Sequence, residues 1–139
     1  MSDPHSKEIR SYNMSMIRSK NTRPEMIVRK YLHKNGYRYK LHDLSLPGKP
    51  DLVLVKYKTA IFVNGCFWHG HNGCRYYVIP KTRTEWWQAK LLKNKENDAQ
   101  NFEELKSGSW KVICIWECEL KNDIAPKTLG SLLKQISNR

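Results

Sequence analysis

The stretch DLVLVKY (Asp51–Tyr57), followed across Lys58 by TAIFVN (Thr59–Asn64), decides the fold of this chain. Both runs are rich in β-branched and aromatic residues, which predicts two strands joined in a hairpin at Lys58. Asp51 stands at the start of the first strand among apolar neighbours, and an isolated buried charge is costly. Asp51 therefore needs a partner, and we expect a hard divalent cation such as Mg²⁺, which prefers oxygen ligands.

Further elements extend from this hairpin in both directions. Thr22 and Glu25 stand at capping-box spacing and Gly36 is a natural stop, which predicts a helix between them. The remaining predicted elements are a strand at 37–42, a turn at 46–50, an irregular segment at 65–83, a helix from Thr84 to about Lys106, a strand at 111–116 and a last helix at about 126–137. The order helix, three strands, helix, strand, helix predicts an α/β fold in which helices flank a small mixed sheet.

The composition predicts one basic domain, at 1–139. The chain has 139 residues, and 25 Lys and Arg residues against 13 Asp and Glu residues give a net charge of +12. This charge favours a polyanionic partner, although a ribosomal or membrane-surface protein would share it. Residues 1–20 are polar and basic, which indicates an arm lying along DNA or, alternatively, a frayed terminus. With no run long enough to span a bilayer and no signal peptide, we expect a cytoplasmic protein, in which disulfides are disfavoured.

The segment CFWHGHNGC (66–74) predicts a metal site that a cysteine beyond the strand at 111–116 can close. The candidate ligands are Cys66, His71, Cys74 and Cys118. Four thiolate and imidazole ligands suit Zn²⁺, and a closed set of four is typical of a structural site. Two alternatives stay open at this point: ordinary thiols beside surface histidines, or His69 as a ligand in place of His71.

Other side chains of the same region can take part in chemistry on DNA. His69 closely follows the second strand of the hairpin, and imidazole exchanges protons near neutral pH, which suits transfer to or from a phosphate-ester oxygen. Glu25 can reach the same site from the first helix, the alternative being a capping role alone. Aromatic rings in a polar loop can insert between base pairs, unless they belong to the core. The rings concerned are Phe67, Trp68, Trp86 and Trp87, and the basic residues around them are Arg75, Lys81, Arg83, Lys90, Lys93 and Lys95.

Pro50-Asp51 followed by two apolar strands resembles the PD-(D/E)xK nucleases, although Val63-Asn64-Gly65 stands where an acid-x-lysine is expected. Six segments in one order closely resemble the very-short-patch repair (Vsr) mismatch endonucleases, over residues 13–120. They are NMSMI (13–17), NTRPE (21–25), LPGKPD (46–51), GCFWH (65–69), TRTEWW (82–87) and WEC (116–118). The resemblance implies a PD-(D/E)xK-like core without the usual second acid and lysine.

The same resemblance implies a role for each candidate residue. Asp51 and the backbone carbonyl of Val63 would bind Mg²⁺, His69 would transfer a proton and Glu25 would support the site. Zinc would be held by Cys66, His71, Cys74 and Cys118, while Phe67, Trp68 and Trp87 would intercalate beside the mismatch. The implied reaction nicks the thymine-containing strand 5′ to a T·G mismatch in duplex DNA, which begins repair of deaminated 5-methylcytosine. Mismatch-repair proteins are a further expected partner, the bacterial nucleoid the expected location, and a monomer the expected state.

Asn64 departs from the family, which commonly has a histidine there. Asparagine can hold a water by hydrogen bonding but cannot exchange a proton near pH 7, so we expect a changed rate and pH dependence rather than a changed reaction. The segment before Cys74 is one residue longer than in the family, and Gly73 can absorb the extra length. Two alternatives to mismatch nicking stay open: a zinc-stapled DNA-binding module without catalysis, and a restriction-type nuclease that cuts fully paired sites.

Overall fold

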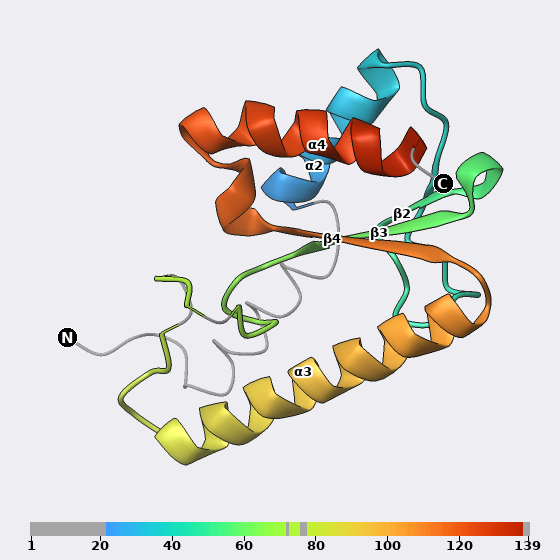
Figure 1. Ribbon diagram of the computed structural model, residues 1–139. Coiled ribbons are helices and arrows are strands. Elements are labelled where there is room, and N and C mark those ends of the chain that lie inside the picture. The colour runs from blue at the N-terminus through green and yellow to red at the C-terminus, as the bar shows by residue number, and fades with distance from the viewer. Residues whose placement is uncertain (1–21, 72, 76–77, 138–139) are drawn as a thin grey trace.

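A four-stranded sheet forms the middle layer of the computed structural model, which describes residues 22–71, 73–75 and 78–137 (Figure 1). Its strands are β1 (Lys40–Leu41), β2 (Leu52–Leu54), β3 (Thr59–Asn64) and β4 (Lys111–Trp116), and its helices are α2 (Arg23–Lys34), α3 (Thr84–Ser107) and α4 (Ala125–Ser137). Short 3₁₀ segments lie at Val55–Tyr57, Glu117–Leu120 and Asn122–Ile124. The predicted order of helix, three strands, helix, strand and helix is confirmed, while the predicted arm at 1–20 lies outside the described residues.

The sheet is mixed, as expected. β1 pairs with β2 and β2 with β3 in antiparallel fashion, whereas β3 pairs with β4 in parallel after the crossover through α3. Asn64 pairs with Trp116 at the end of the parallel ladder, so the segments that follow β3 and β4 leave the sheet at the same edge. Because β2 runs antiparallel to β3, with Leu52 opposite Ile61, Asp51 also lies at this edge.

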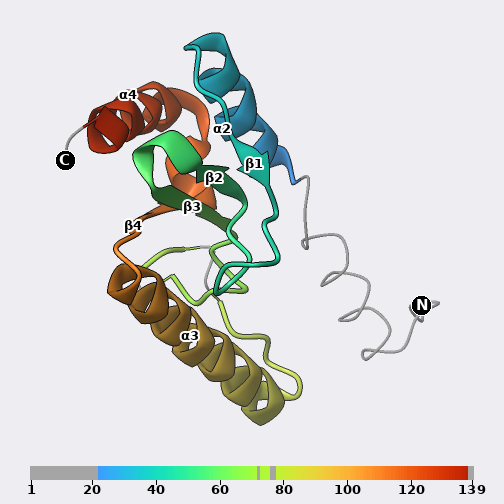
Figure 2. The same cartoon turned by 90° about the vertical axis from the view of Figure 1, so that its right-hand side faces the viewer.

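Helices cover both faces of the sheet, with α2 and α4 on one face and α3 on the other (Figures 1 and 2). Successive strand residues point to opposite faces. Ile61 of β3 therefore joins the core beneath α2 and α4, whereas Ala60 and Phe62 pack with Leu105 of α3 in a second core. Because both faces of the sheet are packed against helices, the sheet edge that carries the candidate functional residues is held in place.

The two strands upstream of Lys58 are shorter than predicted. β1 covers only two residues of the predicted strand at 37–42, and β2 covers three of the predicted strand at 51–57. Val55–Tyr57 form a 3₁₀ turn instead, and Lys58 adopts a left-handed conformation with φ 49°. The hairpin is therefore present, but its turn takes four residues rather than Lys58 alone.

The predicted helices are present within one or two residues of their expected bounds, but Thr84 does not cap α3. Arg83 occupies the cap position in a left-handed conformation (φ 54°), and the hydroxyl of Thr84 donates to the carbonyl of Pro80 at 3.0 Å. Among residues 22–71, 73–75 and 78–137, no helix combines the length and the hydropathy that a membrane span requires.

Candidate active site and metal centres

An open cavity of about 650 Å³ lies at the sheet edge where β3 ends and β2 begins. Five predicted site residues line it, namely Asp51, Val63, Asn64, Trp68 and His69. The cavity is also lined by Arg23, Lys49 and Lys90, so a polyanion entering it would meet positive charge. These residues, which the sequence predicts to share one site, therefore lie around one cavity in the fold.

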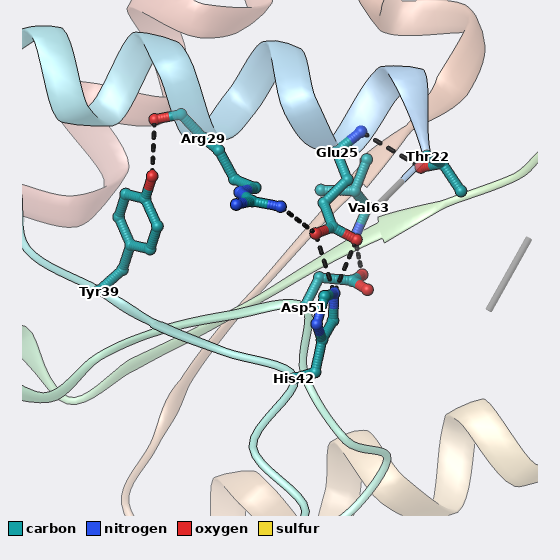
Figure 3. Close-up of polar contacts among 7 residues, drawn as sticks. All are labelled: Thr22, Glu25, Arg29, Tyr39, His42, Asp51 and Val63. Atoms are coloured by element: carbon teal, nitrogen blue, oxygen red, sulfur yellow. Dashed lines mark hydrogen bonds and ion pairs between the residues drawn. The ribbon is translucent and has the colours of Figure 1, made fainter. Parts of the chain in front are cut away.

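Asp51 bonds to the strand that runs past it. β3 continues beyond the start of β2, and the Asp51 carboxylate accepts the backbone N–H of Val63 at 2.7 Å (Figure 3). Burial, and to a smaller extent the nearby charge of Glu25, raises the pKa of Asp51 from its ordinary value of 3.8 to about 6. The ionised carboxylate is thus incompletely compensated by the protein, which is the condition under which a cation stabilises it.

Glu25 is buried, with 1% of its surface exposed, and both predicted roles meet in it. Its backbone N–H donates to the hydroxyl of Thr22 at 3.3 Å, which caps the start of α2. Its carboxylate turns inward, where it accepts from Nε2 of His42 at 2.9 Å and lies 3.4 Å from a guanidinium nitrogen of Arg29 (Figure 3). The carboxylate of Glu25 therefore lies close to Asp51 and His42, and its support of catalysis stays a prediction.

His42 is a residue that sequence reasoning missed. Its backbone N–H donates to the carbonyl of Asp51 at 3.0 Å, and its ring points at Glu25. Ligand atoms of Glu25, His42 and Asp51 all lie within 4.8 Å of one another. No spacing rule connects three positions on a helix, a loop and a strand start, so only the folded chain brings them together.

Asp98 of α3 is a second missed residue, and it holds His69. The Nδ1 atom of His69 lies 2.6 Å from a carboxylate oxygen of Asp98. An ionised carboxylate only accepts, so Nδ1 carries the proton and Nε2 is left as the nitrogen that can exchange one. One turn earlier, the Asn94 amide donates to the carbonyl of Trp68 at 2.9 Å. The spacing of Asn94 and Asp98 by four residues on a helix was the one available signal that both face the same loop.

Close packing against α3 also explains a glycine in this loop. Gly70 has a positive φ of 62°, a conformation that side chains disfavour. A Cβ atom placed there would lie 2.7 Å from Cδ of Lys95. A side chain at residue 70 would therefore require Lys95 to move and would place a larger residue in a left-handed conformation.

The sulfur-rich cluster brings together all four predicted zinc ligands. Ligand atoms of Cys66, His71, Cys74 and Cys118 lie within 4.8 Å of one another. The cluster contains His71 rather than His69, which is bonded to Asp98. The ring of His71 stacks on Trp116 with centroids 4.1 Å apart and planes 3° apart, which orients the imidazole before any ion binds.

The thiols of this cluster are disfavoured as free thiolates. Burial, followed by the neighbouring sulfur groups, raises the pKa of Cys118 from 9.0 to about 12, and burial also raises the pKa of Cys66. The Sγ atom of Cys66 accepts the backbone N–H of Cys118 at 3.4 Å. Neutral thiols that meet at one point stabilise one another only weakly, whereas a soft cation would bind them as thiolates.

Asn64 connects the cavity to the core thiol of β4. It is buried, with 4% of its surface exposed, and its amide donates to Sγ of Cys114 at 3.3 Å. Burial raises the pKa of Cys114 to about 12, so this thiol is neutral. Cys114, which is partly buried, lies outside the sulfur-rich cluster.

The aromatic side chains predicted to intercalate pack on one another. Ring centroids of Phe67 lie 5.2 Å from Trp68 and 5.3 Å from Trp87, and the two indoles are 5.8 Å apart. Trp68 is only 6% exposed, whereas Trp86, beside the cluster, is 39% exposed. Intercalation by these rings stays a prediction, and it requires the cluster to open on DNA.

Comparison with known proteins gives one consistent result. The family model described as DNA mismatch endonuclease Vsr matches residues 2–75. A Type II nicking enzyme of Neisseria meningitidis serogroup A is 46% identical over 139 residues, covering 99% of both chains. A Type II nicking enzyme of Xanthomonas oryzae pv. oryzae is 44% identical over 138 residues, covering 99% of this chain and 96% of its own. The DNA mismatch endonuclease Vsr of Escherichia coli is 40% identical over 121 residues, covering 87% of this chain and 77% of its own.

Proposed function

The chain belongs to the Vsr family of DNA mismatch endonucleases, and on that premise we propose that it is a Mg²⁺-dependent enzyme that nicks DNA at T·G mismatches. The proposed cut lies in the thymine-containing strand, on the 5′ side of the mismatch, and begins very-short-patch repair of deaminated 5-methylcytosine. The names of the relatives support endonuclease activity, since they are called mismatch endonucleases or nicking enzymes. We further propose that the mixed sheet is a PD-(D/E)xK core in which Val63-Asn64-Gly65 replaces the acid-x-lysine.

The observation that carries this proposal is the convergence of Asp51, Val63 and His69 on one cavity. Asp51 is a partly buried carboxylate with a raised pKa, and a hard cation bound by oxygen would favour its ionised form. The backbone carbonyl of Val63 would supply a second oxygen beside it. Mg²⁺ bound there would polarise the scissile phosphodiester and neutralise the charge that develops on it.

The protein side chains would handle the proton and the water. In hydrolysis a water oxygen bonds to phosphorus, one phosphorus–oxygen ester bond breaks, and the leaving oxygen takes up a proton. His69, held through Nδ1 by Asp98, would exchange a proton through Nε2 in this process. Asn64 cannot do so, but its amide oxygen can accept a hydrogen bond from a water in the cavity, while its amide nitrogen stays on Cys114.

A zinc ion held by Cys66, His71, Cys74 and Cys118 would be structural in this proposal. The four donors form a closed set of soft ligands, which suits Zn²⁺ and leaves no position for substrate. They would tie the loop after β3 to the segment after β4. His69 lies in that loop between two of the ligands, so the ion would limit its motion from one side while Asp98 limits it from the other.

DNA would bind over the cavity through electrostatic contacts with its phosphates, and the aromatic rings would distinguish a mismatch from a paired step by inserting between base pairs. The basic residues Arg23, Lys49 and Lys90 line the cavity and can contact phosphates. Inserting a ring between base pairs costs a few kcal/mol of unstacking, and a mismatch lowers this cost. Phe67, Trp68 and Trp87 would provide the rings, leaving their own packing to do so.

Incubation of T·G and T·A duplexes with the protein, with Mg²⁺ and then with chelator, tests the proposal. We expect a nick in the thymine strand of the T·G duplex alone, and only with Mg²⁺. Asp51→Ala should lower the nicking rate at least about 10³-fold with little change in duplex binding, because it removes the cation ligand and not the basic surface. Asp123→Asn, which alters an exposed acid of the 3₁₀ segment Asn122–Ile124, should nick at the normal rate.

The outcomes separate the three candidate functions. Salt-sensitive binding without product at any Mg²⁺ concentration would identify a DNA-binding module. Equal cutting of both duplexes would identify a nuclease for paired sites. Undiminished nicking by Asp51→Ala would remove Asp51 from the reaction.

A further inference from the structure

His42 occupies a conformation that needs an explanation. Its φ of 47° lies in the left-handed region, which residues with side chains rarely adopt. Such residues persist where the surrounding contacts hold them, and they cluster at functional sites. Here the backbone is held by the hydrogen bond from its N–H to the carbonyl of Asp51 at 3.0 Å. The consequence is that the ring is directed toward the carboxylates instead of following the β1 strand direction.

A second contact fixes the segment that carries His42. The hydroxyl of Tyr39, three residues earlier, donates to the carbonyl of Arg29 at 3.2 Å, which ties this segment to α2 (Figure 3). The Nε2 atom of His42 lies 2.9 Å from the Glu25 carboxylate. His42 is therefore held in two ways. Its ring contacts α2 through Glu25, and its backbone is bonded to Asp51 at the start of β2.

Two carboxylates and one imidazole meet at this point. Oxygen atoms of Glu25 and Asp51 and a ring nitrogen of His42 lie within 4.8 Å of one another. Ligands of a divalent cation, at bond lengths of about 2.1 Å, stand roughly 3 to 4 Å apart. The three ligand atoms are thus close enough that local side-chain adjustment would bring them around one ion.

We propose that His42 is a metal ligand, and that Glu25, His42 and Asp51 form a mixed nitrogen and oxygen site that binds Mn²⁺ and related first-row ions more tightly than Mg²⁺. This inference rests on the proposed cation-dependent nuclease, because it concerns the same carboxylate of Asp51. Mg²⁺ prefers oxygen ligands, whereas an imidazole ligand suits transition ions. His42 would then give this chain a cation preference that a site of oxygen ligands alone does not have.

The competing role for His42 is to hold Glu25 by a hydrogen bond without touching the ion. That role predicts an ion bound by oxygen atoms alone. The two roles differ in a property that does not depend on turnover: coupling between the electron spin of bound Mn²⁺ and an imidazole nitrogen. Mn²⁺ is the suitable probe because its hard character makes it a poor ligand partner for the sulfur-rich cluster.

The experiment is a Mn²⁺ titration of the zinc-loaded full chain followed by electron spin resonance, with electron spin-echo modulation to detect a coordinated nitrogen. The wild type should show nitrogen modulation and bind Mn²⁺ more tightly than Mg²⁺. His42→Asn should lose the modulation and bind Mn²⁺ at least roughly tenfold more weakly. Loss of a residue that only hydrogen-bonds to a metal ligand already lowers metal affinity by about this factor. Asparagine is chosen because it tolerates the left-handed conformation; His42→Gln replaces it if the first variant does not fold.

Two control variants make the result specific. His33→Asn removes an exposed imidazole in the last turn of α2 and should change neither the affinity nor the modulation. His69→Gln removes the histidine that lines the neighbouring cavity and should keep the modulation. A modulation that survives in His42→Asn, or that disappears in His69→Gln, overturns the proposal.

Nicking of the T·G duplex by the same preparations separates this inference from the proposed function. Mg²⁺-dependent nicking together with Mn²⁺ bound through oxygen alone would leave the enzyme in place and remove His42 from the cation. Nitrogen modulation that depends on His42, in a protein that nicks neither duplex, would establish the metal site and remove the nuclease.

Discussion

Two clusters of metal-binding side chains lie at the same edge of the sheet, and they are built in opposite ways. The sulfur-rich cluster draws Cys66, His71 and Cys74 from one short loop, and Cys118 from the segment after β4. Cys66 and Cys118 each lie two residues beyond the register pair Asn64 and Trp116, so the parallel ladder alone brings them together. The carboxylate cluster instead takes Glu25, His42 and Asp51 from a helix, a loop and a strand start.

The clusters also differ in what holds them without an ion. Each side chain of the carboxylate cluster has a bond to another part of the protein: Asp51 to Val63, Glu25 to Arg29, and His42 to Glu25. In the sulfur-rich cluster, burial raises the pKa of Cys66 and of Cys118, so that both thiols are neutral without an ion. From this difference we expect the sulfur-rich cluster to depend on a metal for its structure, and the carboxylate cluster to be assembled by the fold and to need a cation only for chemistry.

Removal of the zinc should therefore have the largest effect on the folded protein. Cys118→Ser breaks the closed set of four, and structural zinc in small folds is worth on the order of 10 kcal/mol. We expect the purified variant to retain less than about a tenth of the zinc and its Tm to fall by roughly 10 °C or more. Metal analysis and thermal unfolding followed by circular dichroism measure both.

Cys114→Ser is the matched control for this change. It makes the same substitution on β4, two register positions before Trp116, at a thiol that contacts Asn64 and not the sulfur-rich cluster. This variant should keep its zinc and lose at most a small part of its stability. Equal loss of zinc in both variants would contradict the assignment of Cys118 as a ligand and, with it, the contrast between the two clusters.

His69 lies between the two clusters, and its hydrogen bond to Asp98 sharpens the comparison. Asp98→Asn should leave zinc content and duplex binding unchanged but lower the nicking rate roughly 10² to 10⁴-fold, because an amide does not fix the Nδ1–H tautomer. Glu96→Gln, at an exposed position of the same helix, should nick normally. Single-turnover rates and a pH–rate profile check this: an altered profile indicates positioning, whereas a normal rate would mean that the zinc loop alone orients His69.

The local part of the sulfur-rich cluster could be predicted from the sequence, because three candidate ligands lie within nine residues. Cys118 could only be offered as a residue that can close the set, and His69 stayed open in place of His71, because the parallel pairing of β3 with β4 and the bond of His69 to Asp98 appear only in the folded chain. The strand run from Asp51 to Asn64 likewise predicted the hairpin, because β-branched and aromatic residues are frequent there.

His42 and Asp98 could not be predicted in the same way. The bond between His42 and Glu25 spans 17 residues, and the bond between His69 and Asp98 spans 29, so neither follows a local period. The left-handed turn at His42 and the close approach of Gly70 to Lys95 arise from tertiary packing that no spacing encodes. The strand at 51–57 ended early for a related reason, since Val55–Tyr57 gain a 3₁₀ turn where no neighbouring strand pairs with them.

The smallest expected effect tests the claim that the fold holds the carboxylate cluster without its cation. Burial raises the pKa of Asp51 from 3.8 to about 6, so the folded state binds a proton more tightly than the unfolded state. The stabilising contribution of protonated Asp51 is thus complete below about pH 3.8 and is lost as the pH rises to about 6, at a total cost of roughly 2 to 3 kcal/mol. Asp51→Asn removes this titration while its amide oxygen can still accept the N–H of Val63.

In the absence of added divalent cation, the free energy of unfolding of Asp51→Asn should exceed that of the wild type by a margin that grows between pH 4 and 6 and is constant above it. The difference between two proteins cancels the titration of the zinc ligands, which both share. Added Mg²⁺ should narrow the margin by stabilising the wild type alone. Urea unfolding at several pH values measures the margin, and a margin of zero across this range would mean that the protein already compensates Asp51, which would leave a cation no energetic reason to bind there.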